Sequence, residues 1–398
     1  MATNDDNILS FPNAARRDAS GRRLIPERLK EARYAKSLNQ AELGERIGKT
    51  RQAVSAFELG ERTPEGTTLA QIADLLEQPV SYFTTPDRSG FGPFGPRFFR
   101  ASGAETKRRN LMCDAYANWE VQIAHYLGDS VNYPSVNFPS VSPSDFKGAY
   151  EEEEIEDAAE KCRSVWGLGY GPISNILSLA ESKGIIVSRL RMEGERIEAF
   201  SFWNGARPFI FLASEKFSAS RARFDVAHEI GHLVLHRGVG QEDIEDPKTL
   251  KRIEAEANRF AGALLLPRRS FPNEVFTTRL DAFVELKKRW KVAIQAMVFR
   301  CKDLGIFDEY QVTNLYKQIS ARKWRTKEPL DDLEMMPLEQ PKLLKNAVDL
   351  ILSSGRKNAS DLRNELALSP KIIEALCNLE DGAIAPAETD PPLHLILK

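Results

Sequence analysis

The chain has 398 residues, of which 42% are hydrophobic and 28% charged, and its formal net charge is −2. This length suffices for two or three domains with cores of their own, and the near-zero charge excludes nucleic-acid binding through overall positive charge. The four cysteines are scattered, and neither an apolar leader nor a membrane-length apolar stretch is present. We therefore expect a cytoplasmic protein with reduced thiols.

The N-terminal part contains a helix-turn-helix pattern. Residues 1–22 are mostly polar and are expected to form a flexible arm. Helix-forming patterns with capping residues then cover 26–36, 40–47 and 51–59. The last two are short and are joined by Gly48-Lys49-Thr50, which predicts a helix-turn-helix whose second member enters the major groove of DNA.

Three runs carry a family resemblance: Asn39-Gln-Ala-Glu-Leu43, Val54-Ser-Ala-Phe-Glu-Leu-Gly60, and Thr63-Pro64 followed by Leu69-Ala-Gln-Ile-Ala73. With them, residues 25–83 resemble the XRE (Cro/cI-like) domains. The resemblance implies double-stranded operator DNA as a partner. It also implies five DNA-contacting residues, of which Arg51, Gln52 and Ser55 face base edges while Gln40 and Lys49 meet phosphates. Arg and Gln suit base reading because they form paired hydrogen bonds with guanine and adenine.

The charge of this part is nearly balanced. From Arg22 to Arg88 there are eleven Lys/Arg and ten Asp/Glu residues. Phosphate contacts dominate DNA affinity, so we expect one copy to bind weakly and a homodimer to bind a palindromic site. The alternative that the helices dock a protein instead of DNA remains open.

The region 87–104 is predicted to be a linker because it is rich in Gly and Pro, although four Phe residues indicate that it packs on something. A helix is expected over 105–127 and extended chain over 131–144. The acidic run 151–157 is expected to open a helix rather than to bind a cation.

Strand-like composition follows at 185–190, 197–203 and 208–212, and Asn204-Gly205 predicts a hairpin turn. These strands would form a small sheet. If the last of them lies at the edge of that sheet, a substrate could add to it by backbone pairing.

Three of the five histidines lie in the run His228-Glu-Ile-Gly-His232-Leu-Val-Leu-His236. His-Glu-x-x-His on a helix places His228 and His232 on one face, about 6 Å apart along the axis, so both can reach one zinc ion. Glu229 can then act as the general base toward a water molecule. His236 lies about 12 Å from His228 along the axis and is interpreted as a residue at the helix end.

A third ligand is expected downstream. In a helix over 253–266, Glu256 falls in an apolar stripe, where its charge needs compensation. Glu254 points about 160° away from Glu256, so only one of the two should ligate, and we choose Glu256. Asn258 either orients a ligand or lies at the helix surface.

The runs Arg223-Phe-Asp-Val-Ala-His-Glu-Ile-Gly-His-Leu-Val-Leu-His236 and Glu256-Ala-Asn-Arg-Phe-Ala-Gly-Ala-Leu-Leu-Leu-Pro267 resemble the ImmA/IrrE metallopeptidases. The resemblance extends from about Ala159 past Trp290. It implies a gluzincin-like fold with zinc on two His and a downstream Glu. Known members cleave a helix-turn-helix repressor, which implies the same substrate class here.

The fold class expected from these patterns is α+β and mainly helical. Its predicted parts are an arm (1–22), a helix-turn-helix domain (23–86), a linker (87–104), a peptidase domain (105–300) and a helical C-terminal region (301–398). Within them a helix pair with a break near Trp290 is expected over 283–300, and three short helices over 342–379.

Together the patterns predict a DNA-binding transcriptional regulator fused to a zinc endopeptidase. The expected substrate is a helix-turn-helix regulator, or this chain itself, cut in a stress, phage or toxin-antitoxin response. The alternative is a repressor or antitoxin whose peptidase-like domain senses or docks a partner without turnover.

Overall fold

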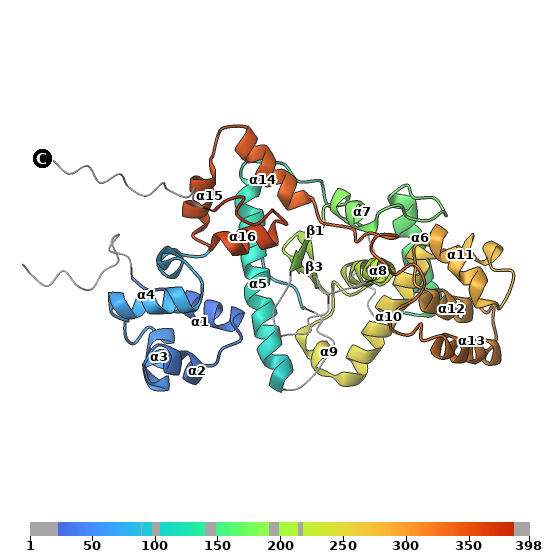
Figure 1. Cartoon of the computed structure of the whole chain (residues 1–398), viewed down its shortest axis with the longest axis horizontal. Coiled ribbons are helices and arrows are strands. Elements are labelled where there is room, and N and C mark those ends of the chain that lie inside the picture. Colours follow the sequence, from blue (N-terminus) through green and yellow to red (C-terminus); the bar gives the residue numbers. More distant parts are fainter. Residues whose placement is uncertain are drawn as a thin grey trace, which may run out of the picture.

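The computed structural model describes residues 23–88, 90–97, 104–139, 149–190, 199–213 and 218–385. The predicted arm and the end of the chain after residue 385 lie outside these ranges. Figure 1 shows the N-terminal helices at one end of the molecule and α11 (Leu280–Trp290), α12 (Ile294–Asp303) and α13 (Glu309–Ala321) at the other. A long helix, α5 (Ala104–Gly128), stands between the N-terminal helices and a small sheet.

The three predicted N-terminal helices are present as α1 (Pro26–Ala35), α2 (Gln40–Arg46) and α3 (Arg51–Glu58). A further helix, α4 (Gly66–Leu75), and a 3-10 turn, η1 (Val80–Thr84), follow them. Asn39 caps α2 and Thr50 caps α3. A Cβ on Gly44 would lie 2.7 Å from the carbonyl oxygen of Lys49. The tight turn between α2 and α3 therefore needs glycine at this position.

A buried polar network holds the three helices at their angles. The Arg33 guanidinium of α1 donates to the Glu58 carboxylate of α3 at 2.5 and 2.9 Å. The Gln40 amide of α2 donates to the same carboxylate at 2.8 Å. Breaking such a pair would leave a buried charge uncompensated, so the network fixes how α3 is presented.

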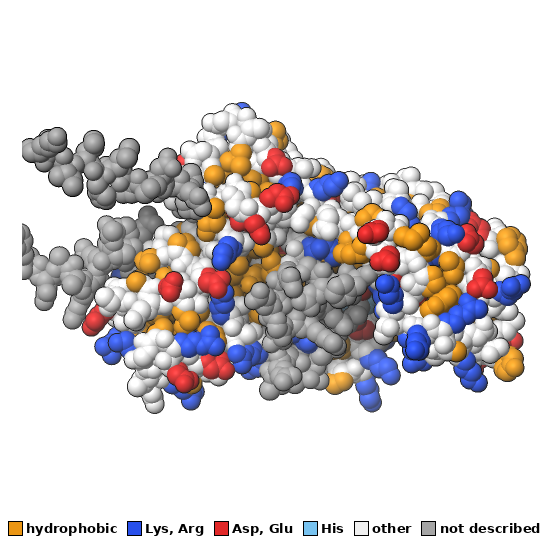
Figure 2. Space-filling model, in the orientation of Figure 1, with side chains coloured by type: hydrophobic (Ala, Val, Ile, Leu, Met, Phe, Trp, Pro, Cys, Tyr) orange, Lys and Arg blue, Asp and Glu red, His pale blue; other side chains and the backbone are white. Residues whose placement is uncertain are grey.

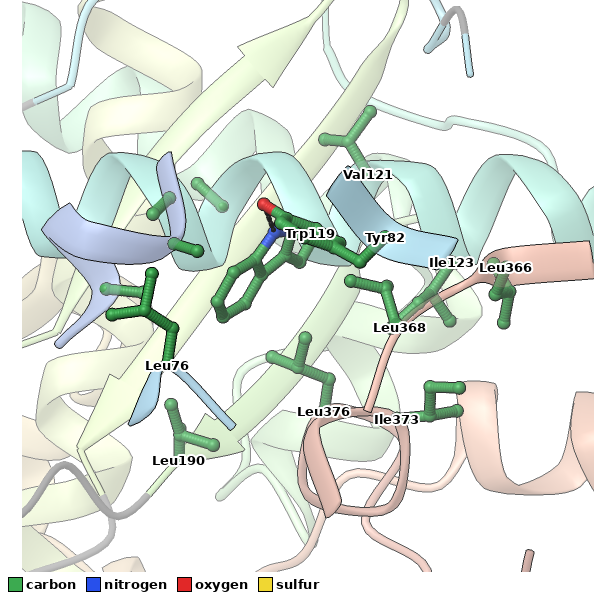
Figure 3. Packing of buried hydrophobic residues seen from close by; sticks show 14 of the residues in the cluster. Leu76, Tyr82, Trp119, Val121, Ile123, Leu190, Leu366, Leu368, Ile373 and Leu376 are labelled. Atoms are coloured by element: carbon green, nitrogen blue, oxygen red, sulfur yellow. Dashed lines mark hydrogen bonds between the residues drawn. The ribbon is translucent and has the colours of Figure 1, made fainter. Parts of the chain in front are cut away.

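The helix-turn-helix part is packed firmly on α5. Trp119 of α5 donates through Nε1 to the Glu31 carboxylate and to the Tyr82 hydroxyl, each at 3.1 Å, and Tyr82 donates to Glu31 at 2.6 Å. Arg28 donates to Gln122 of α5 at 2.9 Å. Figure 3 shows Trp119 and Tyr82 surrounded by aliphatic side chains from distant parts of the chain. The N-terminal part therefore shares a continuous core with α5, one face of the sheet and the C-terminal helices.

The predicted linker also packs, as its Phe content indicated. Phe91 contacts the ring of Phe209, and Phe94 contacts that of Phe202. The Asn204 side chain accepts from the Phe91 amide at 2.6 Å and donates to the Gly92 carbonyl at 2.7 Å. The other two Phe residues of the run, at 98 and 99, lie outside the described ranges.

The sheet has three strands in the order β1-β3-β2: β1 (Ile186–Leu190) pairs parallel with β3 (Arg207–Ala213), and β2 (Phe200–Asn204) pairs antiparallel with it. The predicted hairpin turn is confirmed, with Gly205 at φ +57°. The last strand is central, not an edge, because β1 and β2 flank it. The expectation that a substrate could add to an edge at β3 is therefore wrong.

Alternation along the strands gives the sheet two apolar faces. On β3, Phe209 and Phe211 belong to the core that contains α5, whereas Ile210 and Leu212 belong to the core of the central domain. This second core is formed by α6 (Glu152–Val165), α7 (Ile176–Ser182), α8 (Ala219–Leu235) and α10 (Pro247–Leu265), together with α11, α12 and α13. The short helix α9 (Gln241–Glu245) lies between α8 and α10 in the chain.

The expected break near Trp290 is confirmed, since Lys291 separates α11 from α12 in a left-handed conformation with φ 55°. The C-terminal helices α14 (Leu343–Ser353), α15 (Ala359–Leu366) and α16 (Pro370–Leu376) return to α5 and β1 (Figure 1). The Ser369 amide donates to the Gln78 side chain at 3.0 Å, which links the two ends of the chain.

The α+β, mainly helical fold class is confirmed, with an N-terminal helix-turn-helix part, a central domain that holds the sheet, and a helical C-terminus. Among the described residues, none of the helices combines the length and the apolar character that crossing a membrane requires.

Candidate metal centre and nucleic-acid interface

Helix α8 carries the His-Glu-x-x-His motif in the interior. His228, Glu229 and His232 are each at most 2% exposed. Strand β2 holds the helix in place, because Ser201 donates to the Glu229 carbonyl and Trp203 to the Leu233 carbonyl, each at 3.2 Å. The motif therefore lies directly beside the sheet.

Helix α10 passes close to this motif. A Cβ on Gly231 would lie 3.1 Å from the Phe260 ring and 3.2 Å from the Ala257 carbonyl. The glycine between the two motif histidines thus permits the close approach of α8 and α10. This packing brings side chains of α10 to both imidazoles.

The two motif histidines and Glu254 form one cluster of donor atoms. The Nε2 atoms of His228 and His232 are 3.0 Å apart. The Glu254 carboxylate lies 3.4 Å from Nε2 of His228 and 3.3 Å from Nε2 of His232. Ligand atoms of all three residues lie within 4.8 Å of one another.

The structure corrects our choice of Glu256 as the third residue of this cluster. Glu256 is buried, as the apolar stripe indicated, but its charge has other partners. Its carboxylate lies 2.9 Å from Nε2 of His236 and accepts from the Tyr150 amide at 3.1 Å. Glu254, which points away from Glu256 on α10, takes the place expected for Glu256.

Two further residues fix the orientation of the motif histidines. Nδ1 of His228 lies 3.0 Å from Oδ1 of Asn258, and Nδ1 of His232 lies 3.0 Å from Nδ1 of His236. The two roles considered for Asn258 coexist, because it is exposed at the surface of α10 and its Oδ1 contacts His228. His236 lies at the end of α8, as expected, but is completely buried and contacts the site.

These contacts define the tautomers. Asn258 Oδ1 accepts a hydrogen bond from Nδ1–H of His228, which leaves the lone pair on Nε2. His236 donates from Nε2 to Glu256 and accepts at Nδ1 from His232, which again leaves the Nε2 lone pair of His232 free to ligate. Both lone pairs then point toward the cluster.

The electrostatics agree with this assignment. Burial lowers the pKa of His236 to about 4, against the opposing hydrogen bond to Glu256, so His236 is neutral at pH 7. Burial alone would raise the pKa of Glu254, but in the metal-free site hydrogen bonds from Nε2 protons of His228 and His232, which a bound metal ion would replace, outweigh it and hold that pKa well below its ordinary value. Glu254 is therefore ionised.

Two imidazole lone pairs and a carboxylate directed at one point are the donor set of a catalytic zinc site, which leaves a coordination position for water. The described residues of the cluster thus fit zinc. Glu229 follows His228 on α8 and is not among the three clustered ligands. Sequence reasoning missed Tyr150 and the role of His236. One feature of the sequence does point to Glu254. It lies four residues before Asn258 and therefore on the same face of α10, and Asn258 was considered as a residue that orients a ligand.

The predicted DNA-contacting residues gather at α2 and α3. Lys49, Arg51 and Gln52 are exposed, and Ser55 is partly exposed. Gln40 is the first residue of α2, and its amide is turned toward Glu58 on α3. Their contacts with DNA remain a prediction.

Comparison with known proteins agrees with both parts. Residues 29–83 match the helix-turn-helix family, and residues 180–302 match the peptidase family M78, described as an IrrE N-terminal-like domain. The chain is 37% identical over 59 residues to the uncharacterized HTH-type transcriptional regulator YqaE of Bacillus subtilis (strain 168). That match covers 15% of this chain and 51% of the relative, so the chain spans about half the length of that protein. The chain thus joins an XRE-like helix-turn-helix domain to an IrrE/ImmA-like peptidase domain.

Proposed function

We propose that this protein is a DNA-binding transcriptional regulator with a built-in zinc endopeptidase that cuts a regulatory protein. The observation that carries the peptidase part is the cluster of His228, His232 and Glu254, with Glu229 next to the first of them. The expected substrate is a helix-turn-helix regulator or this chain itself. A stress, phage or toxin-antitoxin setting belongs to the same proposal, as do a homodimeric state and a cytoplasmic location.

His228, His232 and Glu254 would hold the zinc ion, and Asn258 and His236 would keep the two imidazoles in their ligating tautomers. Bound zinc supplies a Lewis acid that polarises a peptide carbonyl and makes water acidic enough to react near neutral pH.

Glu229 is the proton carrier of the reaction. Its carboxylate accepts a proton from the attacking water and then returns that proton to the nitrogen of the leaving amine. The buried environment of Glu229 strengthens its electrostatic interactions, since few water molecules screen its charge. A Gln at this position keeps the shape of the side chain and cannot carry the proton.

The regulatory part rests on the helix-turn-helix geometry. The network of Arg33, Gln40 and Glu58 fixes α3 relative to α1 and α2, and the exposed Arg51 and Gln52 lie at the start of α3. This is the end of a recognition helix that contacts base edges in the major groove.

The test is a comparison of new protein N-termini, mapped by mass spectrometry, in native cells that carry wild type or Glu229→Gln, with and without stress. We expect a new N-terminus inside a regulator, or in this chain, that disappears in Glu229→Gln. Glu285→Gln, an exposed substitution on α11, is the matched control and should keep the cut. If no terminus depends on Glu229 under any condition, the endopeptidase is excluded and the domain acts as a sensor or docking module.

A further inference from the structure

The helix-turn-helix domain has few positive charges to offer to DNA. Arg28 and Arg33 are buried in ion pairs with acidic side chains and cannot reach a phosphate. Exposed basic side chains near α3 include Lys49 and Arg51, and exposed acids such as Glu45 and Glu61 lie close to them in the sequence. Because phosphate neutralisation dominates affinity, this surface would bind DNA weakly by itself.

A second source of positive charge lies beside it, at the start of α5. Lys107, Arg108 and Arg109 are consecutive, and Lys107 and Arg108 are exposed. Arg108 donates to the Glu42 carboxylate of α2 at 3.1 and 3.4 Å. Glu42 in turn accepts from the Asn39 amide at 2.7 Å, so this contact is made at the N-terminal end of α2.

The position of this basic group follows from the fold. Gln40, the residue predicted to meet a phosphate, is the first residue of α2 and adjoins Asn39. Arg108 pairs with the acid nearest to the N-terminal end of α2 and so reduces the repulsion that Glu42 would exert on DNA.

The arrangement is rigid. Further along α5, Trp119 and Gln122 bind Glu31 and Arg28 of α1 in the interior, and Ser37 donates to the Met112 sulfur at 3.4 Å. The start of α5 is therefore held at a fixed place relative to α2. Figure 2 shows blue side chains, with some red ones among them, along the lower edge of the part that contains α2 and α3.

We infer that the start of α5, with Lys107 and Arg108 exposed, extends the DNA-binding surface beyond the helix-turn-helix and contacts the phosphate backbone of the duplex that α3 reads. The inference rests on the DNA-binding part of the proposed function and not on the peptidase. It assigns α5 a role in nucleic-acid binding in addition to its structural role in the first core.

The test measures binding of the full chain to a fluorescein-labelled duplex of mixed sequence, by anisotropy over a series of salt concentrations. The variants are Lys107→Ala/Arg108→Ala and, to avoid any effect of losing the Glu42 contact, Lys107→Ala alone. The matched control is Lys317→Ala/Arg325→Ala, which removes the same charges from exposed positions at the far end of the molecule. Arg51→Glu tests the helix-turn-helix surface itself.

We expect the α5 double variant to bind roughly tenfold more weakly at about 0.1 M salt, with a salt slope reduced by about one for each lost phosphate contact. Lys107→Ala should show a smaller change in the same direction, and the control should match wild type. Equal slopes for the α5 variants and the control, while Arg51→Glu loses binding, would overturn the inference and leave the DNA-binding function intact. If Arg51→Glu also binds like wild type, both the inference and the DNA-binding proposal fail.

Discussion

Two glutamates in the interior, on opposite sides of the sheet, have opposite electrostatic properties. Glu254, beside α8, has a pKa below its ordinary value because hydrogen bonds from two histidines outweigh the effect of burial. Glu120, on α5, is completely buried, and burial raises its pKa to about 8, which the neighbouring Ser188 hydroxyl offsets only in part. At pH 7 the carboxyl group of Glu254 is therefore charged and that of Glu120 is neutral.

The difference shows how to separate a candidate site from a core. Around α8 and α10, polar side chains are arranged so that their remaining donor atoms meet at one point. Around α5, the polar contacts join elements to one another, as Trp119 and Tyr82 do with Glu31. Both regions bury polar side chains. Only around α8 and α10 do free donor atoms of several side chains converge on one point, and this convergence distinguishes the candidate metal centre.

The largest expected effect comes from the two glutamates of α10. Glu254→Gln should lower zinc affinity by more than about 100-fold because it removes a charged ligand. Glu256→Gln should lower it by no more than about tenfold, since Glu256 acts only through His236 and His232. Competition with a chelator of known affinity measures both values. A larger loss in Glu256→Gln would restore Glu256 as the ligand and refute our assignment.

A smaller effect is expected from the residue that orients His228. Asn258→Ala should lower zinc affinity about 10- to 100-fold, because Nδ1 of His228 loses its acceptor and the ring is no longer held. Asn258→Asp keeps an acceptor oxygen and should bind zinc nearly as well as wild type. Similar losses in the Ala and Asp variants would show that Asn258 acts by packing alone.

The sequence predicted the bounds of α1, α2, α3 and α5 and the His-Glu-x-x-His motif because these depend on local pattern. The third ligand depends on how α10 is rotated against α8, which the periodicity of one helix does not show. The apolar stripe correctly identified Glu256 as buried. It did not reveal that His236 and the Tyr150 amide compensate the charge of Glu256. Tyr150 lies 106 positions before Glu256 in the chain, so no local pattern could show this contact.

The place of β3 was missed for a similar reason. Composition located the three strands, but β1 and β3 pair in parallel with β2 outside them, and strand order depends on packing between distant segments. The basic group at the start of α5 also lay outside the segment that resembled a DNA-binding domain. Its relation to α2 became visible only through the Arg108–Glu42 contact.

The smallest expected effect concerns the neutral carboxyl of α5. Because the folded protein raises the pKa of Glu120 from 4.5 to about 8, the folded state retains a proton that the unfolded chain releases between these values. Its contribution to stability is complete below about pH 4.5 and is lost as the pH rises toward 8. Glu120→Gln should remove this dependence and leave the protein more stable than wild type near pH 8.

Urea denaturation of wild type, Glu120→Gln and the exposed control Glu285→Gln at several pH values between 5 and 8 measures this effect. The free energy of unfolding should change less with pH for Glu120→Gln than for the other two proteins. Parallel curves for all three proteins would mean that Glu120 is ionised in the fold, and the contrast with Glu254 would disappear.

The most direct measurement is diffraction at the zinc absorption edge from crystals of the full chain grown with zinc. We expect one anomalous peak, bound by Nε2 of His228, Nε2 of His232 and the carboxylate of Glu254. His236 should lie between His232 and Glu256 and should not contact the metal ion. A peak bound by Glu256, or no peak at the motif histidines, would contradict this expectation.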